Sequence, residues 1–347
     1  MDKKLVIFYN SKYDKHIGVS GSFEGADRIK YVIDNISSKI ELKTEEFFSD
    51  KELDKFINYS TIIKNIKTKY DKLEFLNCIN CSFKNDIKSD KCVMCYSSNN
   101  LKLMIKIVSD IDGDGTSMCK DSIKSVESSI KTICSGLDFQ AKTNNNVFLL
   151  IRPPGHHSTI INKSNNGCSF TNDGFCIINN ISIGIDYLKN KYNIKKIAIV
   201  DWDVHHGHGT QQIYYERSDI LFIDIHRYDG KFYPGTGNIN EIGSGEGKNY
   251  TINIPLDKNS DEKIYLKAFD EICIPSIQKF NPDWIFISCG FDAHKDDPIG
   301  GMKLESSSYR KFYDKIYQLN LKTNITLFLE GGYNKNSILE SICKLVK

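Results

Sequence analysis

The chain has 347 residues, of which 40% are hydrophobic and 26% are charged, a composition typical of a globular protein with a large apolar core. The formal net charge is only +2 at pH 7 and the lysines are spread along the chain, which excludes the strongly basic surface of a direct nucleic-acid binder. No apolar run approaches the roughly 18 residues of a transmembrane helix, and the N-terminus lacks a secretory signal. We therefore expect an intracellular protein, nuclear or cytoplasmic, with no membrane partner and with its eleven cysteines reduced or bound to metal.

Apolar runs rich in Val, Ile, Leu and Phe recur along the chain and predict buried strands. They cover residues 5–9, 147–151, 196–200, 220–226, 284–289 and 325–329. Strands that are apolar on both faces are typical of a parallel sheet covered by helices, so the sequence predicts an α/β fold. Segments with helical spacing fall at 25–60, 123–134 and 177–188. A glycine-rich run, 243–248, lies between two strands and predicts a hairpin-like connection.

Paired cysteines predict a structural zinc site between residues 78 and 95. The four ligands are Cys78, Cys81, Cys92 and Cys95. Two Cys-x-x-Cys pairs make a closed tetrahedral site for Zn²⁺, whereas the alternative of four unrelated buried cysteines does not explain the paired spacing. The segment is similar to the NZF-type zinc finger, with Asn85 at the asparagine of that pattern and Leu76 in place of its usual tryptophan. We expect this finger to be a module at 74–98, inserted in one catalytic domain that spans 1–347.

The resemblance to NZF-type fingers also implies a partner. Ubiquitin-binding members carry Thr-Phe after the second cysteine and a methionine between the last two, and Ser82, Phe83 and Met94 are similar here. The alternative is a purely structural zinc site, which stabilises the fold and in which Phe83 packs against the main domain.

Polar side chains follow two of the predicted strands. Asp203 and His205 come after 196–200 and, being two apart on extended backbone, point to the same side. Asp292 follows 284–289 and reaches the same edge of a parallel sheet. Two carboxylates and an imidazole suit a catalytic Zn²⁺ that keeps a position for water. The alternative is a polar loop with scattered histidines.

Two other strand ends carry candidate catalytic groups. The tandem His156 and His157 follow the strand at 147–151 and are interpreted as a general base with its partner. Tyr333 follows a pair of glycines whose freedom of backbone conformation projects its hydroxyl into the same crevice. Alternatively, Tyr333 only packs against its neighbours. Phe175 is expected to wall a pocket.

Taken together, these motifs resemble the zinc-dependent histone deacetylase family, and its class II branch in particular. The motifs that carry the resemblance lie at 152–157, 174–176, 201–210, 290–293 and 330–333. The similarity runs over about residues 114–333 and implies the arginase-like fold, with three layers around a parallel sheet.

The resemblance also implies a role for each residue of the site. Asp203, His205 and Asp292 bind the catalytic Zn²⁺. His157 is the general base, and His156 is its electrostatic partner, hydrogen-bonded to Asp201. Tyr333 donates to the substrate carbonyl. The substrate-binding residues are Phe175, Tyr233, Gly155 and Ile299. A K⁺ site uses Asp201, Asp203, His205, Asp224 and Ile225.

Three positions depart from the family pattern. His208 stands where relatives have Asp, Asn or Gln to orient the second histidine. Asp224 replaces a common serine of the potassium site. The early His-Pro-Glu element of the family has no clear counterpart near His16.

The sequence therefore predicts an enzyme, a zinc-dependent amidohydrolase that removes the acetyl group from N-acetyl-lysine in proteins. One alternative is a deacetylase of acetylated polyamines or another small amide. In members specialised for acetylpolyamines a glutamate follows the corresponding proline, whereas Ile299 follows Pro298 here. An alternative of another class is a catalytically weak adaptor that binds ubiquitin through residues 78–95.

Overall fold

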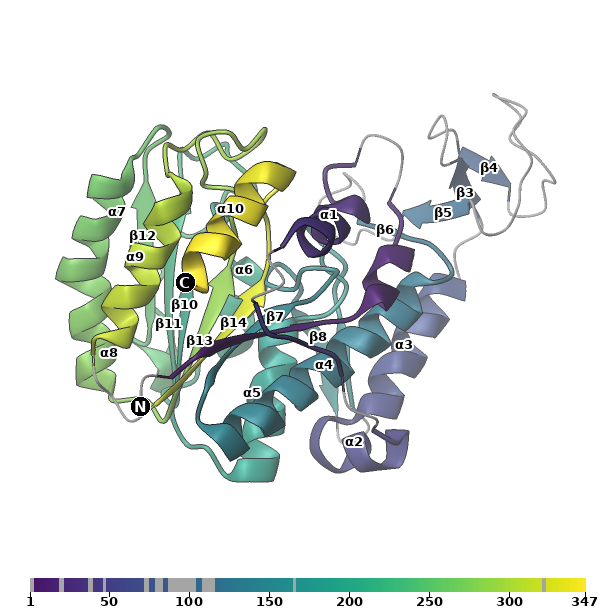
Figure 1. Ribbon diagram of the computed structural model, residues 1–347. Helices are drawn as coiled ribbons and strands as arrows, with labels where there is room; N and C mark the ends of the chain where they lie inside the picture. The colour runs from purple at the N-terminus through teal and green to yellow at the C-terminus, as the bar shows by residue number, and fades with distance from the viewer. Residues whose placement is uncertain are drawn as a thin grey trace.

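The computed structural model describes residues 3–18, 22–36, 40–45, 48–71, 75–78, 84–86, 104–107, 116–164, 167–319 and 323–347. An eight-stranded sheet lies at its centre, with the strand order β12-β11-β10-β13-β14-β7-β1-β2 (Figure 1). Its strands are β1 (Leu5–Tyr9), β2 (Leu42–Lys43), β7 (Asn146–Leu150), β10 (Ile197–Asp201), β11 (Ile220–Arg227), β12 (Thr251–Leu256), β13 (Trp284–Cys289) and β14 (Asn324–Leu329). Every neighbouring pair of strands is parallel. The predicted α/β fold with a parallel sheet is confirmed.

Helices cover both faces of this sheet, as Figure 1 shows. One face packs against α2 (Asp50–Ile57), α3 (Tyr59–Asp71), α4 (Ser122–Thr143) and α5 (Asn180–Tyr192). The other packs against α1 (Asp27–Asn35), α7 (Glu262–Ala268), the π-helical turn η4 (Phe269–Cys273), α8 (Ile274–Phe280), α9 (Ser306–Tyr317) and α10 (Lys335–Leu345). In β7, Val147 and Leu149 enter the first core and Phe148 and Leu150 the second. This alternation explains why the strand is apolar throughout.

Asparagine ends several of the helices that cover the sheet. Asn144, Asn193 and Asn281 follow α4, α5 and α8, and each has a positive φ in the left-handed region. Asparagine is one of the few non-glycine residues that adopts this conformation readily, and its use at a helix C-terminus satisfies carbonyl groups of the last turn. These asparagines therefore act as local stop signals at the ends of the three helices.

The segment of the predicted zinc finger is only partly described. The backbone of β3 (Phe75–Cys78) pairs with β4 (Lys84–Asp86) and β5 (Met104–Ile107), and β5 pairs with β6 (Ser117–Met118), all antiparallel. The side chain of Cys78 lies outside the described residues, as do Cys81, Cys92, Cys95, Ser82, Phe83 and Met94. The structural zinc site, the 74–98 module and the ubiquitin partner therefore stay predictions.

The connection at 243–248 differs from the prediction. β12 runs parallel to β11, with Phe222 opposite Thr251, so the hairpin-like interpretation is wrong. Parallel neighbours require a crossover of a dozen residues or more, and residues 228–250 supply one. This crossover contains the short helix η3 (Gly245–Gly247).

The remaining short elements are η1 (Ser11–Lys15), the antiparallel pair β8 (Ile160–Ser164) and β9 (Gly167–Phe170), and α6 (His208–Tyr214). Among the described residues, no helix combines the length and the apolar character needed to cross a membrane.

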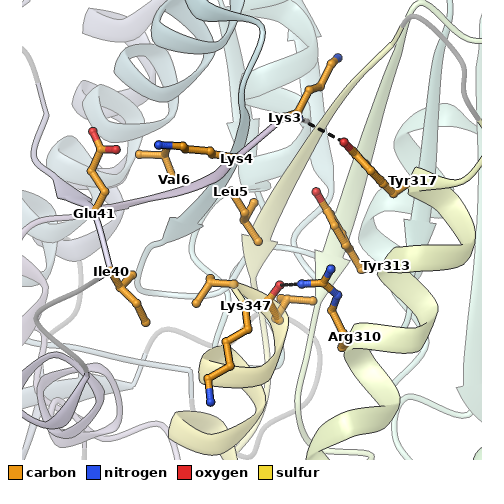
Figure 2. A pocket seen from close by; sticks show the side chains of 12 residues that line it. Lys3, Lys4, Leu5, Val6, Ile40, Glu41, Arg310, Tyr313, Tyr317 and Lys347 are labelled. Carbon is orange, nitrogen blue, oxygen red and sulfur yellow. Dashed lines mark hydrogen bonds between the residues drawn. The ribbon is translucent and has the colours of Figure 1, made fainter. Parts of the chain in front are cut away.

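A large open cavity lies at the amino end of β1. It has a volume of about 640 Å³ and is lined by Lys3, Lys4, Glu41, Arg310 and Lys347, among others (Figure 2). Because the polar motifs follow the carboxyl ends of the strands, this cavity is at the opposite edge of the sheet from them. It therefore takes no part in the site described below.

The core predicts a strong dependence of stability on the strand residues beside the site. Ile199 of β10 is fully buried, whereas Ile239 is 62% exposed. We expect Ile199→Ala to lower the free energy of unfolding by about 2–5 kcal/mol, because it leaves a cavity between packed layers. Ile239→Ala is the matched control and should change it by about 0.5 kcal/mol at most. Denaturant titration measures both, and equal effects would contradict the assignment of β10 to the core.

Candidate metal centre

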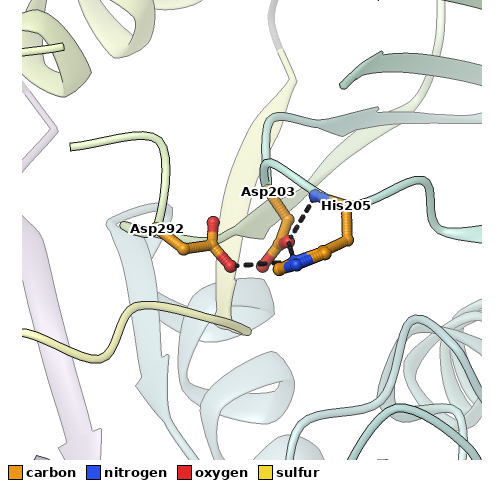
Figure 3. Close-up of side chains that lie close together, drawn as sticks. All are labelled: Asp203, His205 and Asp292. Atoms are coloured by element: carbon orange, nitrogen blue, oxygen red, sulfur yellow. Dashed lines mark hydrogen bonds and ion pairs between the residues drawn. The ribbon is translucent and has the colours of Figure 1, made fainter. Parts of the chain in front are cut away.

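A buried acid–histidine–acid cluster lies at the carboxyl edge of the sheet. Asp203 and His205 come from the loop after β10, and Asp292 follows β13, the neighbour of β10. Figure 3 shows the three side chains pointing toward one another, and one ligand atom from each lies within 4.8 Å of the others. The structure therefore brings together the three residues that the sequence predicts as zinc ligands.

Backbone groups hold the two carboxylates in place. Asp203 accepts hydrogen bonds from the backbone N–H groups of His205, at 2.9 Å, and Gly331, at 2.7 Å. Asp292 accepts one from Val204 at 2.9 Å through Oδ1. Its Oδ2 has no hydrogen-bond partner in the described part of the chain, although it lies 3.2 Å from His205 Nδ1. One buried carboxylate oxygen is thus left for a cation.

The electrostatics of the cluster favour a bound cation. Burial, and then the neighbouring charge of Asp203, raise the pKa of Asp292 to about 7. Burial alone would lower the pKa of His205, but its hydrogen bond to Asp203 and the adjacent carboxylate of Asp292 raise it to about 9. Carboxylates so close together in an apolar interior repel each other unless a proton or a cation lies between them. The cluster offers two carboxylates and one imidazole, and one oxygen of the Asp292 carboxylate is without a hydrogen bond in the described part of the chain. This set of ligands fits a catalytic zinc ion.

The paired glycines after β14 allow this close approach. A Cβ atom on Gly331 would collide with the carboxylates of both Asp203 and Asp292. Gly332 has φ +108°, a conformation that residues with a side chain rarely adopt. The predicted need for unusual backbone conformation before Tyr333 is confirmed.

The tandem histidines lie in contrasting environments. His156 Nδ1 lies 3.0 Å from Asp201 Oδ2, so the predicted hydrogen bond is present. Burial alone would lower the pKa of His156, but the charges of Asp201 and Asp203 raise it well above its usual value. Burial and the adjacent His156 charge lower the pKa of His157 well below its usual value. Two neighbouring histidines whose pKa values are shifted in opposite directions are suited to different roles: His156 as a charged partner and His157 as a neutral base.

Aromatic rings surround the cluster. Tyr233 packs edge-on to His157, with ring centroids 5.0 Å apart, and Phe232 stacks on His205 at 4.9 Å. Phe175 packs edge-on to Tyr333 at 5.9 Å. Phe175 also has φ +67°, and such a conformation in a bulky residue is characteristic of sites where the surrounding structure imposes it.

The other two predicted substrate-binding residues, Gly155 and Ile299, are placed by backbone hydrogen bonds to buried carboxylates. Gly155 is buried against Asn180, and its N–H donates to Glu330 Oε2 at 2.7 Å. Ile299 is half-buried, and its N–H donates to Asp297 Oδ1 at 3.0 Å. The other oxygen of Asp297 accepts from the backbone of Tyr333, which ties Ile299 to the Tyr333 loop.

The predicted potassium residues line the neighbouring strand ends. Asp201 of β10 lies directly opposite Asp224 of β11, and Ile225 follows on the same strand. Asp224 accepts from the backbone of Gly207 at 2.8 Å and lies 2.7 Å from His226 Nδ1. The bound K⁺ itself stays a prediction.

A buried ion cluster behind the site was missed in the sequence. The Glu24 carboxylate lies 2.5 Å and 2.7 Å from two nitrogens of Arg152, and 3.1 Å from Arg28. Arg28 donates to the carbonyls of Gly332 and Glu330, and its guanidinium lies 4.8 Å from the centre of the Tyr333 ring.

Glu24 also contacts His16, near which the sequence shows no clear counterpart of the family's His-Pro-Glu element. Its carboxylate lies 3.4 Å from His16 Nε2, and Ser22-Phe23 precede it. Burial alone would raise the pKa of Glu24, but Arg152 and His16 hold it well below its usual value. The spacing of Glu24 and Arg28, four residues apart at the start of a helical pattern, was the available signal.

A parallel sheet with a buried acid–histidine–acid cluster at its carboxyl edge defines an α/β protein with a candidate metal centre. A family model for the histone deacetylase domain matches residues 23–347, so the chain belongs to the histone deacetylase domain family, a family of zinc-dependent hydrolases.

Individual relatives agree with this membership. Histone deacetylase 5 of Arabidopsis thaliana is 40% identical over 201 residues, or 56% of this chain and 29% of that protein. Type-2 histone deacetylase 2 of Dictyostelium discoideum is 32% identical over 352 residues, or 95% of this chain and 20% of that protein. The crystal structure of the HDA15 HD domain has the same fold, with a TM-score of 0.77 at 24% identity over 100% of this chain and 89% of that chain. The chain thus spans less than a third of the length of either curated relative.

Metal binding at this cluster should release protons. Asp292 and His205 both hold a proton near pH 6 in the metal-free chain, and His205 alone holds one near pH 8, because their pKa values are about 7 and about 9. We expect zinc to displace about two protons at pH 6 and about one at pH 8, so that affinity rises with pH.

Calorimetric zinc titration in buffers of different ionisation enthalpy counts these protons. The Asp292→Asn variant serves as the control, since any zinc bound by cysteines contributes equally to both chains. A proton count that does not fall from pH 6 to pH 8 would contradict this assignment of the ligands.

Proposed function

We propose that this chain hydrolyses the acetyl amide of N-acetyl-lysine in proteins, with Zn²⁺ as its cofactor. The observation that carries the proposal is the buried three-ligand cluster with His157, whose pKa is lowered by burial, at a ring distance of 5.9 Å from His205. We further propose that 1–347 forms one catalytic domain and that 74–98 is an inserted finger. Family membership supports deacetylation in general.

The cluster of Asp203, His205 and Asp292 would hold the zinc ion. A zinc ion bound there supplies a Lewis acid and lowers the pKa of water from about 15.7 towards 7. His157 is neutral, because burial lowers its pKa, and its ring lies 5.9 Å from that of His205. It therefore accepts the proton of the attacking water and later returns this proton to the leaving lysine amine. His156 stays charged beside Asp201 and favours the developing negative charge.

Tyr333 supplies the hydrogen-bond donor for the substrate. Burial raises the pKa of its hydroxyl well above the usual value, so the group keeps its proton. It donates to the carbonyl oxygen on which negative charge develops, a contribution of roughly 3–4 kcal/mol per donor. Arg28, stacked on the ring, fixes its orientation.

The residues at the rim favour a peptide over a polyamine. A free acetylpolyamine carries a distant ammonium that requires an acidic partner. Ile299, tied to the Tyr333 loop through Asp297, cannot provide one. Glu24 cannot replace it, since its carboxylate is buried and already paired with Arg152 and Arg28. A peptide presents a neutral backbone at the same distance, against which an aliphatic rim packs.

Removal of the Tyr333 hydroxyl tests the catalytic assignment. We expect Tyr333→Phe to lower kcat on an acetyl-lysine peptide by about 100- to 1,000-fold with a smaller change in KM, because the donor acts in the transition state. Tyr309→Phe is the matched control: Tyr309 is fully buried, and its hydroxyl has no hydrogen-bond partner within the described residues. Steady-state kinetics measure both variants. A Tyr333→Phe enzyme as fast as the Tyr309→Phe enzyme would remove Tyr333 from the mechanism.

Substrate class is tested by direct competition. We expect kcat/KM for acetyl-lysine peptides to exceed that for N8-acetylspermidine by about 10- to 100-fold, the value of one missing charge-assisted hydrogen bond. Ile299→Glu should narrow this ratio, whereas Ile264→Glu, a control on the exposed side of α7, should not. A wild-type preference for the acetylpolyamine would overturn the protein substrate and favour the small-amide alternative.

A further inference from the structure

A chain of hydrogen bonds begins at Nδ1 of His157. His157 Nδ1 lies 3.2 Å from His208 Nδ1, and His208 Nε2 lies 2.7 Å from Asp173 Oδ2. The second oxygen of Asp173 accepts from the Tyr233 hydroxyl at 2.6 Å. Asp173 is fully buried, whereas His208 is partly buried, with 15% of its side chain exposed. The His–His–Asp series thus occupies the place where relatives are expected to use one Asp, Asn or Gln.

The geometry restricts where the protons lie. A carboxylate only accepts hydrogen bonds, so His208 must donate to Asp173 from Nε2. Two ring nitrogens 3.2 Å apart form a hydrogen bond only if one carries a proton and the other does not. A neutral His208 has its proton on Nε2, which leaves Nδ1 bare and makes His157 the donor. His157 then carries its proton on Nδ1 and keeps the lone pair of Nε2 for the substrate side.

The alternative arrangement would disable the base. If His208 were a cation, it would donate from Nδ1, and a neutral His157 would hold its proton on Nε2. That tautomer has no lone pair on Nε2, the ring nitrogen that is not bonded to His208, and so it has no free nitrogen to accept a proton from water. Whether His157 or His208 donates the hydrogen bond between the two rings therefore decides whether His157 can act as a general base.

We infer that Asp173, by holding the His208 proton on Nε2, leaves His208 Nδ1 to accept from His157 and so fixes the catalytic tautomer of His157; His208 and Asp173 are then positioning residues for deacetylation. This inference rests on the proposed function. Tyr233 completes the device, because its hydroxyl holds the other oxygen of Asp173 while its ring packs against His157. His208 stands where the family pattern has Asp, Asn or Gln, and Asp173 compensates for this difference. Its carboxylate reaches His157 through one additional hydrogen bond, by way of His208.

Nitrogen-15 NMR of the ring nitrogens of the full chain, with its metal content as purified, tests the tautomer directly. The chemical shifts should show His157 protonated at Nδ1 and bare at Nε2. A His157 protonated at Nε2 overturns the inference. This measurement needs no turnover. A chain without deacetylase activity would therefore contradict the proposed function only, and the NMR result for His157 would still test the inference.

Kinetics of variants separate positioning from structure. We expect His208→Ala to lower kcat by about 100-fold with KM changed by less than about 3-fold. His208→Asn should recover at least about 10-fold of this loss, since its amide oxygen can accept from His157 Nδ1. Asp173→Asn should lower kcat by about 10-fold in the wild-type background but by less than about 2-fold beside His208→Ala, because the two act in series.

A matched control for Asp173→Asn is available elsewhere in the fold. Asp138 is also buried and accepts a hydrogen bond from a tyrosine, Tyr187, at 3.0 Å, far from the site. Asp138→Asn should lower the unfolding temperature without changing kcat. The inference is overturned if Asp173→Asn lowers kcat equally in the wild-type and the His208→Ala backgrounds. It is also overturned if the His208→Ala enzyme has the wild-type kcat.

Discussion

The burial of two like-charged carboxylates, Asp203 and Asp292, is the constraint on which the rest of the site depends. Both are inaccessible to water at the carboxyl edge of a sheet whose strands are otherwise apolar. Backbone donors from Val204, His205 and Gly331 satisfy most of their oxygens, but hydrogen bonds do not cancel the repulsion between the two charges. The folded chain therefore needs protons or a divalent cation at this point, and the missing side chain at Gly331 leaves the required room.

The buried carboxylates also affect the protonation of the neighbouring histidines, and a second buried ion cluster holds the loops of the site. The charges of Asp201 and Asp203 hold His156 as a cation, and burial together with this positive charge lowers the pKa of its neighbour His157 well below the usual value. On the far side, Glu24 binds Arg152 and Arg28, so that one buried ion cluster anchors both the turn before the tandem histidines and the loop that carries Tyr333. The proposed catalytic base, His157, and the proposed hydrogen-bond donor, Tyr333, thus depend on the same set of salt bridges.

The sequence predicts the sheet because its strands are uninterrupted apolar runs, and it predicts the metal cluster because Asp203, His205 and Asp292 each follow such a run. Features that depend on distant pairing escape it. The direction of β12 is decided by its partner β11, and the contact of His208 with Asp173 joins residues 35 positions apart. Glu24 is marked locally only by its spacing of four residues from Arg28, and only the fold brings Arg152 to it. Local patterns therefore identify the reacting groups, whereas the residues that orient them are found only in three dimensions.

The metal content of the purified chain tests the central claim most directly. With the catalytic cluster and the predicted cysteine site both filled, elemental analysis should find about two zinc ions per chain. The Asp292→Asn variant should hold about one, and a variant with Cys81 and Cys92 changed to serine should also hold about one, the ion at the catalytic cluster. An Asp292→Asn chain that folds and still holds the full wild-type complement of zinc would contradict the assignment of the buried carboxylates to a metal centre.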